Sequence, residues 1–270
     1  MPDTQTKLPL RRQGIYLLPN LFTLAALFAG FYAIVQGMNN QFELAAVAIF
    51  IAMILDGMDG RVARMTHSQS AFGAEFDSLS DMVSFGVAPA LVAYEWMLRD
   101  FGKLGWMVAF IYCAGAALRL ARFNTMIGVA DKRWFTGLPS PAAAALVAGL
   151  VWIVHAYNLD VPGIDWIALV FTAFAGISMV TNVRFYSFKE INPRAKVPFV
   201  AMLVVLVVIL LTASTPALVL FGFFVVYALS GYVLSLLRMG RRKPAVEPVP
   251  RAELDVSPPA DKSDDSPRQD

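Results

Sequence analysis

Four aspartates lie near the ends of two apolar segments of the chain, with the spacing of residues that share a helix face. Asp56 and Asp59 are three positions apart, and Asp77 and Asp81 are four positions apart. Side chains at these separations are neighbours on a helix surface. If the two acidic faces meet, four negative charges repel one another strongly in a medium of low dielectric constant. Some of these carboxylates must then be protonated, or a multivalent cation must neutralise them.

Oxygen ligands with no paired histidine or cysteine nearby favour Mg²⁺ or Mn²⁺ over zinc. A carboxylate cage for two such ions is a common device for phosphoryl transfer. We therefore predict a two-ion site of Mg²⁺ or Mn²⁺ held by all four aspartates. The alternative interpretation is a group of helix-end charges that lipid headgroups solvate.

The residues between the acids leave room for a ligand and offer it polar groups. Gly60, Ala63 and Gly73 keep the two helices bare beside the acids, so that a bulky anionic ligand can approach. Arg64 continues the face of Asp56 and can bind a phosphate through two hydrogen bonds. Ser70 precedes the second acidic helix, where it can cap that helix or bond to a nucleotide.

Long apolar segments must position these residues. The 270-residue chain is 57% apolar and 16% charged, well below the roughly 25% charged residues of soluble domains. A soluble enzyme is therefore excluded, and the single cysteine excludes a disulfide scaffold. A membrane-spanning helix needs about 20 mostly apolar residues, and the segment that starts at residue 42 reaches this length only if it continues into the acidic stretch. We predict an all-α, polytopic integral membrane protein with about eight transmembrane helices, at 20–37, 42–60, 75–97, 104–122, 138–157, 163–183, 197–213 and 216–237.

The basic residues predict the orientation, because loops on the cytoplasmic side carry an excess of Lys and Arg. With the N-terminus in the cytoplasm, only Arg99 and Lys103 of the basic residues that flank the helices fall outside. Both termini are then cytoplasmic, and the acids lie at the cytoplasmic ends of their helices. We expect three parts: a cytoplasmic N-terminal segment at 1–19 with the pattern of a short interfacial helix, a transmembrane domain at 20–240, and a disordered cytoplasmic tail at 241–270, which is rich in proline and acids.

The acidic residues and their neighbours resemble the signature of the CDP-alcohol phosphatidyltransferases, and every fixed position is present: Asp56-x2-Asp59-Gly60-x2-Ala63-Arg64-x8-Gly73-x3-Asp77-x3-Asp81. Within that family, four further stretches resemble the bacterial phosphatidylserine synthases. They are LPNLFT at 18–23, EFDSLSDMVSFGVAPA at 75–90, RLARFN at 119–124 and FTGLPSP at 135–141. The resemblance covers roughly residues 10–240.

The resemblance implies that an alcohol hydroxyl attacks the lipid-side phosphorus of CDP-diacylglycerol and that CMP leaves. It implies that Asp56 and Asp77 bridge two divalent ions, while Asp59 completes the shell of the first. Asp81 would complete the shell of the second and act as general base. A homodimer in the bacterial cytoplasmic (inner) membrane is also implied, with membrane lipids around it and no nucleic-acid partner. The implied contacts to CDP-diacylglycerol are Asn20, Thr23, Gly60, Arg64 and Ser70; for Asn20 and Thr23, capping of a helix start is the alternative.

A second group of residues indicates which alcohol is the acceptor. Serine carries a carboxylate, so its site needs a cation, and Arg119 and Arg122 are three positions apart near a cytoplasmic helix end, with Asn124 beyond them. The alternative for both arginines is an orienting positive charge with no ligand. The resemblance of the RLARFN stretch favours L-serine as acceptor.

Two other functions remain open. Glycerol 3-phosphate as acceptor would make the chain a phosphatidylglycerophosphate synthase. A transporter that relays protons or ions through carboxylates is the alternative from a different class. Transporter sites usually lie at the bilayer midplane between inverted repeats, whereas here the acids are off-centre and no repeat is found. Metal-dependent release of CMP distinguishes an enzyme from a carrier.

Overall fold

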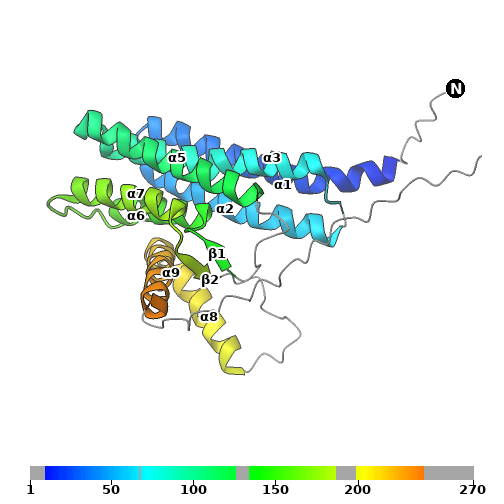
Figure 1. Ribbon diagram of the computed structural model, residues 1–270. Helices are drawn as coiled ribbons and strands as arrows, with labels where there is room; N and C mark the ends of the chain where they lie inside the picture. The colour runs from blue at the N-terminus through cyan, green and yellow to red at the C-terminus, as the bar shows by residue number, and fades with distance from the viewer. Residues whose placement is uncertain (1–9, 67, 126–133, 187–198, 240–270) are drawn as a thin grey trace, which may run out of the picture.

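The computed structural model describes residues 10–66, 68–125, 134–186 and 199–239, and these are almost entirely helical (Figure 1). A helix occupies each of the eight predicted apolar segments, and the third is one continuous helical rod made of α3, a π-helical turn η1 and α4. The predicted tail at 241–270 and the first nine residues of the predicted segment 1–19 lie outside the described residues. The elements in chain order are α1 (Leu10–Met38), α2 (Phe42–Met65), α3 (Ala71–Asp81), η1 (Met82–Val87), α4 (Ala88–Trp96), the 3-10 turn η2 (Leu98–Phe101), α5 (Lys103–Thr125), β1 (Trp134–Thr136), α6 (Ser140–Ala156), α7 (Ile164–Val180), β2 (Arg184–Tyr186), α8 (Phe199–Ser214) and α9 (Pro216–Met239).

Four helices in the described part of the chain are long and apolar enough to cross a membrane: Leu18–Met38, Ala71–Trp96, Lys103–Thr125 and Pro216–Leu237. The helices α6 and α7 are apolar but have 17 residues each. The helix α2 has 24 residues and carries charged groups at both ends. It continues through the acidic stretch to Met65, as its length requires if it is to span a bilayer.

The expectation of an all-α chain holds except for two three-residue strands. β1 and β2 pair antiparallel, with Phe135 opposite Phe185. They join the start of α6 to the end of α7, and the side chain of Phe185 is fully buried. Strands of three residues are too short to show the alternation of apolar and polar residues that identifies a strand in a sequence.

The helix α6 lies between the two halves of the apolar core. Its side chains are buried on nearly every face, which is typical of a helix that is apolar all round. The run Ala142–Ala145 contributes to both halves. Ala142 and Ala143 pack in the cluster formed by α4, α5, α7 and α9, while Ala144 and Ala145 pack in the cluster formed by α1, α2 and α4. Small side chains let these helices approach closely.

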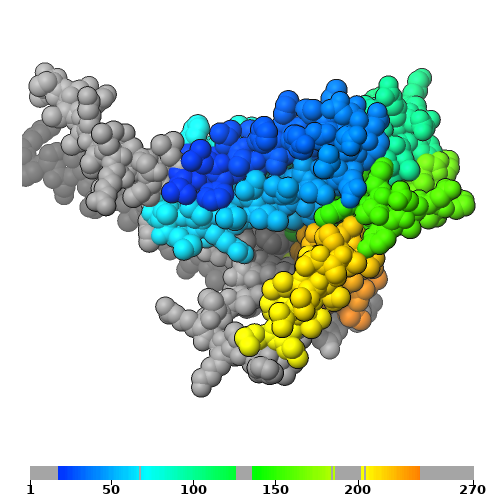
Figure 2. All heavy atoms as spheres, turned by 180° about the vertical axis from the view of Figure 1, so that it is seen from behind, coloured from blue at the N-terminus to red at the C-terminus, as the bar shows by residue number. Residues whose placement is uncertain are grey.

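The helix α8 has the opposite character. It packs on α9, and it extends away from α1 and α2 (Figure 2). Leu206 and Leu210 have 51% and 60% of their surface exposed. In a bilayer such a surface faces lipid.

The helix α1 holds the acidic helices in place. It packs against α2, α3 and η1. Two buried serine hydroxyls donate to carbonyl oxygens of α1: Ser80 to Thr23 at 3.1 Å and Ser84 to Ala26 at 3.1 Å. These bonds fix the side of α3 and η1 that faces α1, and they leave the adjacent side, which carries Asp77, free to face α2.

Candidate active site

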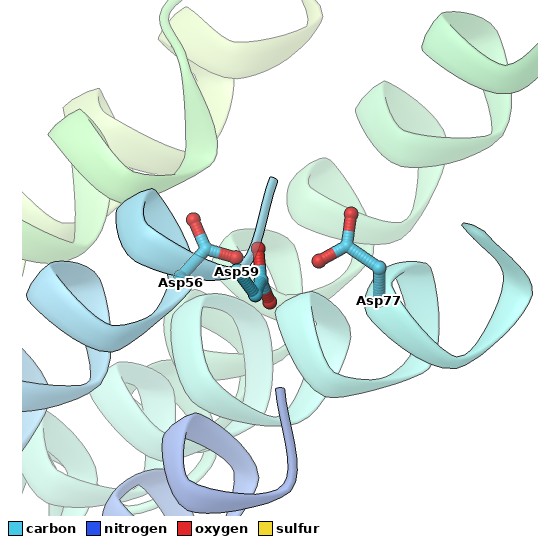
Figure 3. A group of neighbouring side chains, drawn as sticks. All are labelled: Asp56, Asp59 and Asp77. Carbon is cyan, nitrogen blue, oxygen red and sulfur yellow. The ribbon is translucent and has the colours of Figure 1, made fainter. Parts of the chain in front are cut away.

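Three carboxylates converge between α2 and α3. Asp56, Asp59 and Asp77 each offer an oxygen atom, and these oxygens all lie within 4.8 Å of one another. Figure 3 shows the three side chains projecting into the same space between the helices. Asp59 is 5% exposed, and the other two are half-buried. Within the described ranges no lysine or arginine forms a salt bridge with any of them, so the cluster calls for a cation from outside the chain.

Asp81 lies one helical turn beyond Asp77, at the end of α3. It is within electrostatic range of Asp56, Asp77 and Arg119. One oxygen of Asp77 and one of Asp81 are buried and have no hydrogen-bond partner among the residues that the structure describes. A buried carboxylate oxygen without a partner is costly. These two oxygens therefore fit a bound cation, and the oxygen-only donor set fits a hard divalent ion such as Mg²⁺ or Mn²⁺.

A threonine from α1 orients Asp59. The Thr23 hydroxyl lies 2.8 Å from one Asp59 carboxylate oxygen and is its donor. The Thr23 side chain is 3% exposed, so this bond is shielded from water. Partners of this kind orient metal-binding side chains and tune their affinity. The family resemblance implies a contact of Thr23 with the nucleotide, with capping of a helix start as the alternative. The structure places Thr23 inside α1, away from the helix start, and gives it a contact with the acidic cluster.

A cavity of about 290 Å³ opens beside the acids. Asp59 and Asp77 form part of its wall, and Ser68 and Gln69 line it too, although the sequence analysis assigned them no role. The seven residues predicted either to contact the nucleotide or to leave room for it all line this cavity: Asn20, Thr23, Gly60, Ala63, Arg64, Ser70 and Gly73.

The start of α3 leaves little room for a side chain at position 73, which is a glycine. Ser70 caps the helix, since its hydroxyl accepts a hydrogen bond from the Gly73 N–H at 3.0 Å. A Cβ atom on Gly73 would lie 3.1 Å from the Ser70 hydroxyl oxygen and 3.2 Å from the Asn20 amide oxygen. On the facing helix, a Cβ on Gly60 would lie 3.6 Å from the Arg64 guanidinium. The guanidinium therefore lies close to Gly60 at the wall of the cavity.

Arg119 faces the acids from α5. Its guanidinium donates to the Ser140 hydroxyl at 2.7 Å and is within electrostatic range of Asp81 and of Tyr227 on α9. The Nε atom of Arg119 is buried and lacks a hydrogen-bond partner within the described part of the chain. Arg119 does not line the cavity beside Asp59. It therefore offers a partly buried positive charge within range of Asp81, separate from that cavity.

The other two residues predicted to bind serine point elsewhere. Arg122 donates to the Asn182 side-chain oxygen at 3.0 Å in an exposed position. Asn124 donates to the Ser78 hydroxyl at 3.0 Å, also in an exposed position. Of the three predicted residues, only Arg119 is brought within range of an aspartate of the site.

Sequence reasoning missed two neighbours of Arg119. Ser140 is completely buried at the first position of α6, within a stretch that was noted only for its resemblance. Tyr227 is on α9, far along the chain, and lies in an apolar run like any spanning segment. No local pattern links either residue to Arg119, because the packing of α6 on α5 and of α9 on α6 creates both proximities.

The chain is similar to a family of known proteins. The sequence matches the model of a family described as CDP-alcohol phosphatidyltransferase over residues 16–183, more than half of the chain. A Helicobacter pylori protein (strain ATCC 700392 / 26695) named CDP-diacylglycerol–serine O-phosphatidyltransferase is 36% identical over 225 residues, which cover 83% of this chain and 94% of that protein. A Mycobacterium tuberculosis protein (strain H37Rv) of the same name is 42% identical over 150 residues, 53% of this chain and 52% of its own length. A protein of that name from Methanocaldococcus jannaschii is 34% identical over 171 residues, 63% of this chain and 74% of its own.

Proposed function

This chain belongs to the CDP-alcohol phosphatidyltransferase family, and from this premise we propose that it transfers the phosphatidyl group of CDP-diacylglycerol to the hydroxyl of L-serine. The products are phosphatidylserine and CMP. The observation that carries the proposal is the convergence of three carboxylates, two of which line a cavity together with other residues of the family signature. The names of the relatives from three distant organisms support serine as the acceptor.

The cavity is the proposed site of the cytidine diphosphate portion. Gly60, Ala63 and Gly73 line this cavity. Because their side chains are small or absent, the nucleotide can come close to the acids. Arg64 binds phosphate oxygens, since a guanidinium presents paired donors that match them. Hydrogen-bonding groups for the rest of the nucleotide come from Asn20, Thr23 and Ser70.

The acidic cluster is the proposed divalent-metal site. Asp56, Asp59, Asp77 and Asp81 would hold two Mg²⁺ or Mn²⁺ ions. When bound, such ions neutralise the diphosphate and the negative charge that develops on the departing CMP. Thr23 holds the Asp59 carboxylate in one orientation for this purpose.

Asp81 is the proposed general base. Its carboxylate accepts the proton of the serine hydroxyl, the serine oxygen forms a bond to the lipid-side phosphorus, and the bond from that phosphorus to the CMP oxygen breaks. Arg119, within range of Asp81, binds the serine carboxylate and holds the hydroxyl near the base. Holding two reactants in attack geometry is a large part of catalysis in such a transfer.

The variant Arg119→Ala tests the acceptor site. We expect the KM for serine to rise at least about tenfold, because a hydrogen bond to a charged group contributes about 1.5–3 kcal/mol, while the KM for CDP-diacylglycerol changes less than about twofold. Arg122→Ala is expected to raise the serine KM less, since its guanidinium bonds to Asn182. Arg99→Ala is the control, because Arg99 pairs with Glu95 in an exposed position. Unchanged serine kinetics in both Arg119→Ala and Arg122→Ala would remove these arginines from the site.

We further propose that all eight long apolar segments span the bacterial cytoplasmic membrane, with both termini and the acidic site on the cytoplasmic side. The distribution of basic residues supports this orientation. A water-soluble acceptor must reach the site from the cytoplasm while the acyl chains of the donor stay in lipid, and a site near helix ends satisfies both needs. Residues 20–240 form the catalytic domain, the protein is a homodimer, and the tail at 241–270 is dispensable for the reaction.

One assay tests the function. Purified protein is incubated with CDP-diacylglycerol, Mn²⁺ or Mg²⁺, and radiolabelled serine or glycerol 3-phosphate, and both CMP and labelled lipid are measured. We expect metal-dependent CMP release with label from serine in the lipid product. Label from glycerol 3-phosphate instead would identify a phosphatidylglycerophosphate synthase. Absence of CMP release, together with uptake of a solute into vesicles, would identify a carrier.

A further inference from the structure

The helical rod that carries Asp77 and Asp81 is not a regular α-helix. α3 ends at Asp81, and Met82–Val87 form the π-helical turn η1 before α4 begins. The N–H of Ala88 bonds to the carbonyl of Val83, five residues earlier. Turns of this kind are rare and frequently accompany functional sites. Here the widened turn directly follows the residue that we propose as general base.

Pro89 explains why the helix widens at this place. Proline has no N–H to donate to the carbonyl four residues earlier, and in a regular helix its ring clashes with that carbonyl. The carbonyl in question belongs to Phe85. Both Phe85 and Pro89 are buried, so this oxygen cannot turn to water and needs a donor from another element.

Tyr112 of α5 is that donor. Its hydroxyl donates to the Phe85 carbonyl at 3.1 Å, and its side chain is completely buried. One turn further along α5, Ala116 lies so close that a Cβ on Gly86 would come within 3.1 Å of its methyl group. Two successive turns of α5 thus contact two successive residues of η1.

The opposite side of η1 is held by α1. The Ser84 hydroxyl donates to the Ala26 carbonyl. A Cβ on Gly30 would lie 2.7 Å from the Cα atom of Ser84, so the two backbones are in close contact there. The widened turn is therefore clamped between α1 and α5, and its shape is set by contacts on both sides.

We propose that Tyr112 is a positioning residue for the acidic site: its hydroxyl holds the Phe85 carbonyl in the widened turn and so fixes the rotation of α3 that directs Asp77 and Asp81 toward α2. One residue of a helix corresponds to about 100° of rotation. A regular helix through residues 82–87 would turn the acidic stripe relative to α4 by about that angle. The expected effect of Tyr112 on catalysis rests on the proposed function. Its expected effect on the positions of Asp77 and Asp81 does not.

The variant Tyr112→Phe removes the hydroxyl and keeps the ring. Two measurements are made on the purified full-length protein. Electron paramagnetic resonance gives the Kd for Mn²⁺, and the kinetics of CMP release give kcat and the KM values. We expect Mn²⁺ binding to weaken at least about fivefold and kcat to fall at least about tenfold, since displacements near 1 Å cost up to about 10²-fold in rate. The KM values for serine and CDP-diacylglycerol are expected to stay within about twofold.

Tyr232→Phe is the matched control, because Tyr232 also shares a hydrogen bond, with the Ser178 hydroxyl at 2.6 Å, and lies on α9 away from η1. It is expected to leave Mn²⁺ binding and kcat near those of the parent protein. If Tyr112→Phe behaves like Tyr232→Phe in both measurements, the proposal is overturned.

A second variant tests whether the Phe85 carbonyl is the link. Pro89→Ala supplies an N–H that can donate to this carbonyl, so adding Tyr112→Phe to Pro89→Ala is expected to change Mn²⁺ binding by less than about twofold. An equal loss in both backgrounds would overturn the proposal. If Tyr112→Phe alone yields no folded protein, recovery of a folded, Mn²⁺-binding protein in the Pro89→Ala background supports the proposal, and failure to recover it counts against it. Weakened Mn²⁺ binding in Tyr112→Phe, with no serine-dependent CMP release from the parent protein, would keep the positioning role and reject the proposed function.

Discussion

Replacing Asp81 by asparagine is expected to lower the kcat of phosphatidyl transfer by about 10³-fold, while the Kd for CDP-diacylglycerol changes less than about threefold. A positioned general base contributes roughly 10²–10⁴-fold to a rate, and asparagine cannot accept the proton of the serine hydroxyl. Asp81 does not line the cavity that we assign to the nucleotide, so loss of its charge leaves the binding surface for the donor intact. The measurement is CMP release under saturating serine, together with CDP-diacylglycerol binding to the protein in nanodiscs.

Glu75→Gln is the control for this change. Glu75 is on the same helix as Asp81, but it is exposed and lies off the acidic stripe. The Glu75→Gln substitution removes one negative charge from the same region and is expected to leave kcat and the Kd for CDP-diacylglycerol near the parent values. Joint loss of transfer and donor binding in Asp81→Asn would indicate that Asp81 acts as a metal ligand alone.

Treatment with EDTA is expected to abolish CMP release, to below about a thousandth of the starting rate, and added Mn²⁺ or Mg²⁺ is expected to restore it. The physical reason is the cluster of Asp56, Asp59 and Asp77, whose carboxylates repel one another and a diphosphate unless cations are bound. Thr23→Val gives a graded form of the same test. It removes the hydrogen bond to Asp59 without changing the side-chain size, and loss of such a partner costs about 10–100-fold in metal affinity or activity.

The half-saturating Mn²⁺ concentration of Thr23→Val is therefore expected to rise about tenfold, with near-normal kcat at high Mn²⁺. A buried threonine elsewhere serves as comparison: Thr172→Val on α7 changes the same groups and is expected to leave the Mn²⁺ dependence unaltered. Transfer that is indifferent to EDTA would exclude the divalent site.

The acidic cluster could be predicted because its geometry is mostly local. Spacings of three and four residues set the faces of α2 and α3, and a short connection makes these helices neighbours. The same applies to the cavity, whose walls come from segments that border those helices. Thr23 was named only through the family resemblance, because its bond to Asp59 depends on how α1 packs against α2.

The surroundings of Arg119 could not be predicted in the same way. Arg119 and Arg122 share a helix face by spacing, yet one bonds to Ser140 and the other to Asn182. Long side chains bond to whichever partners the neighbouring helices present, and those neighbours are set by tertiary packing. The interior of the segment at 75–97 shows the same limit. Its helical character follows from composition, but the widened turn depends on Tyr112 as well as on Pro89.

The difference in packing between α6 and α8 determines which substitutions each helix can tolerate during evolution. Each methyl group of Ala142–Ala145 touches one or the other half of the core, and adding methylenes to packed sites costs about 1–3 kcal/mol. Side chains larger than alanine are therefore expected to be disfavoured at these four positions. The outward face of α8 carries no such restriction, so leucine, valine and isoleucine can interchange there at little cost. Natural sequence variation is therefore expected to be sparse along α6 and abundant along α8, even though both segments are strongly apolar in sequence.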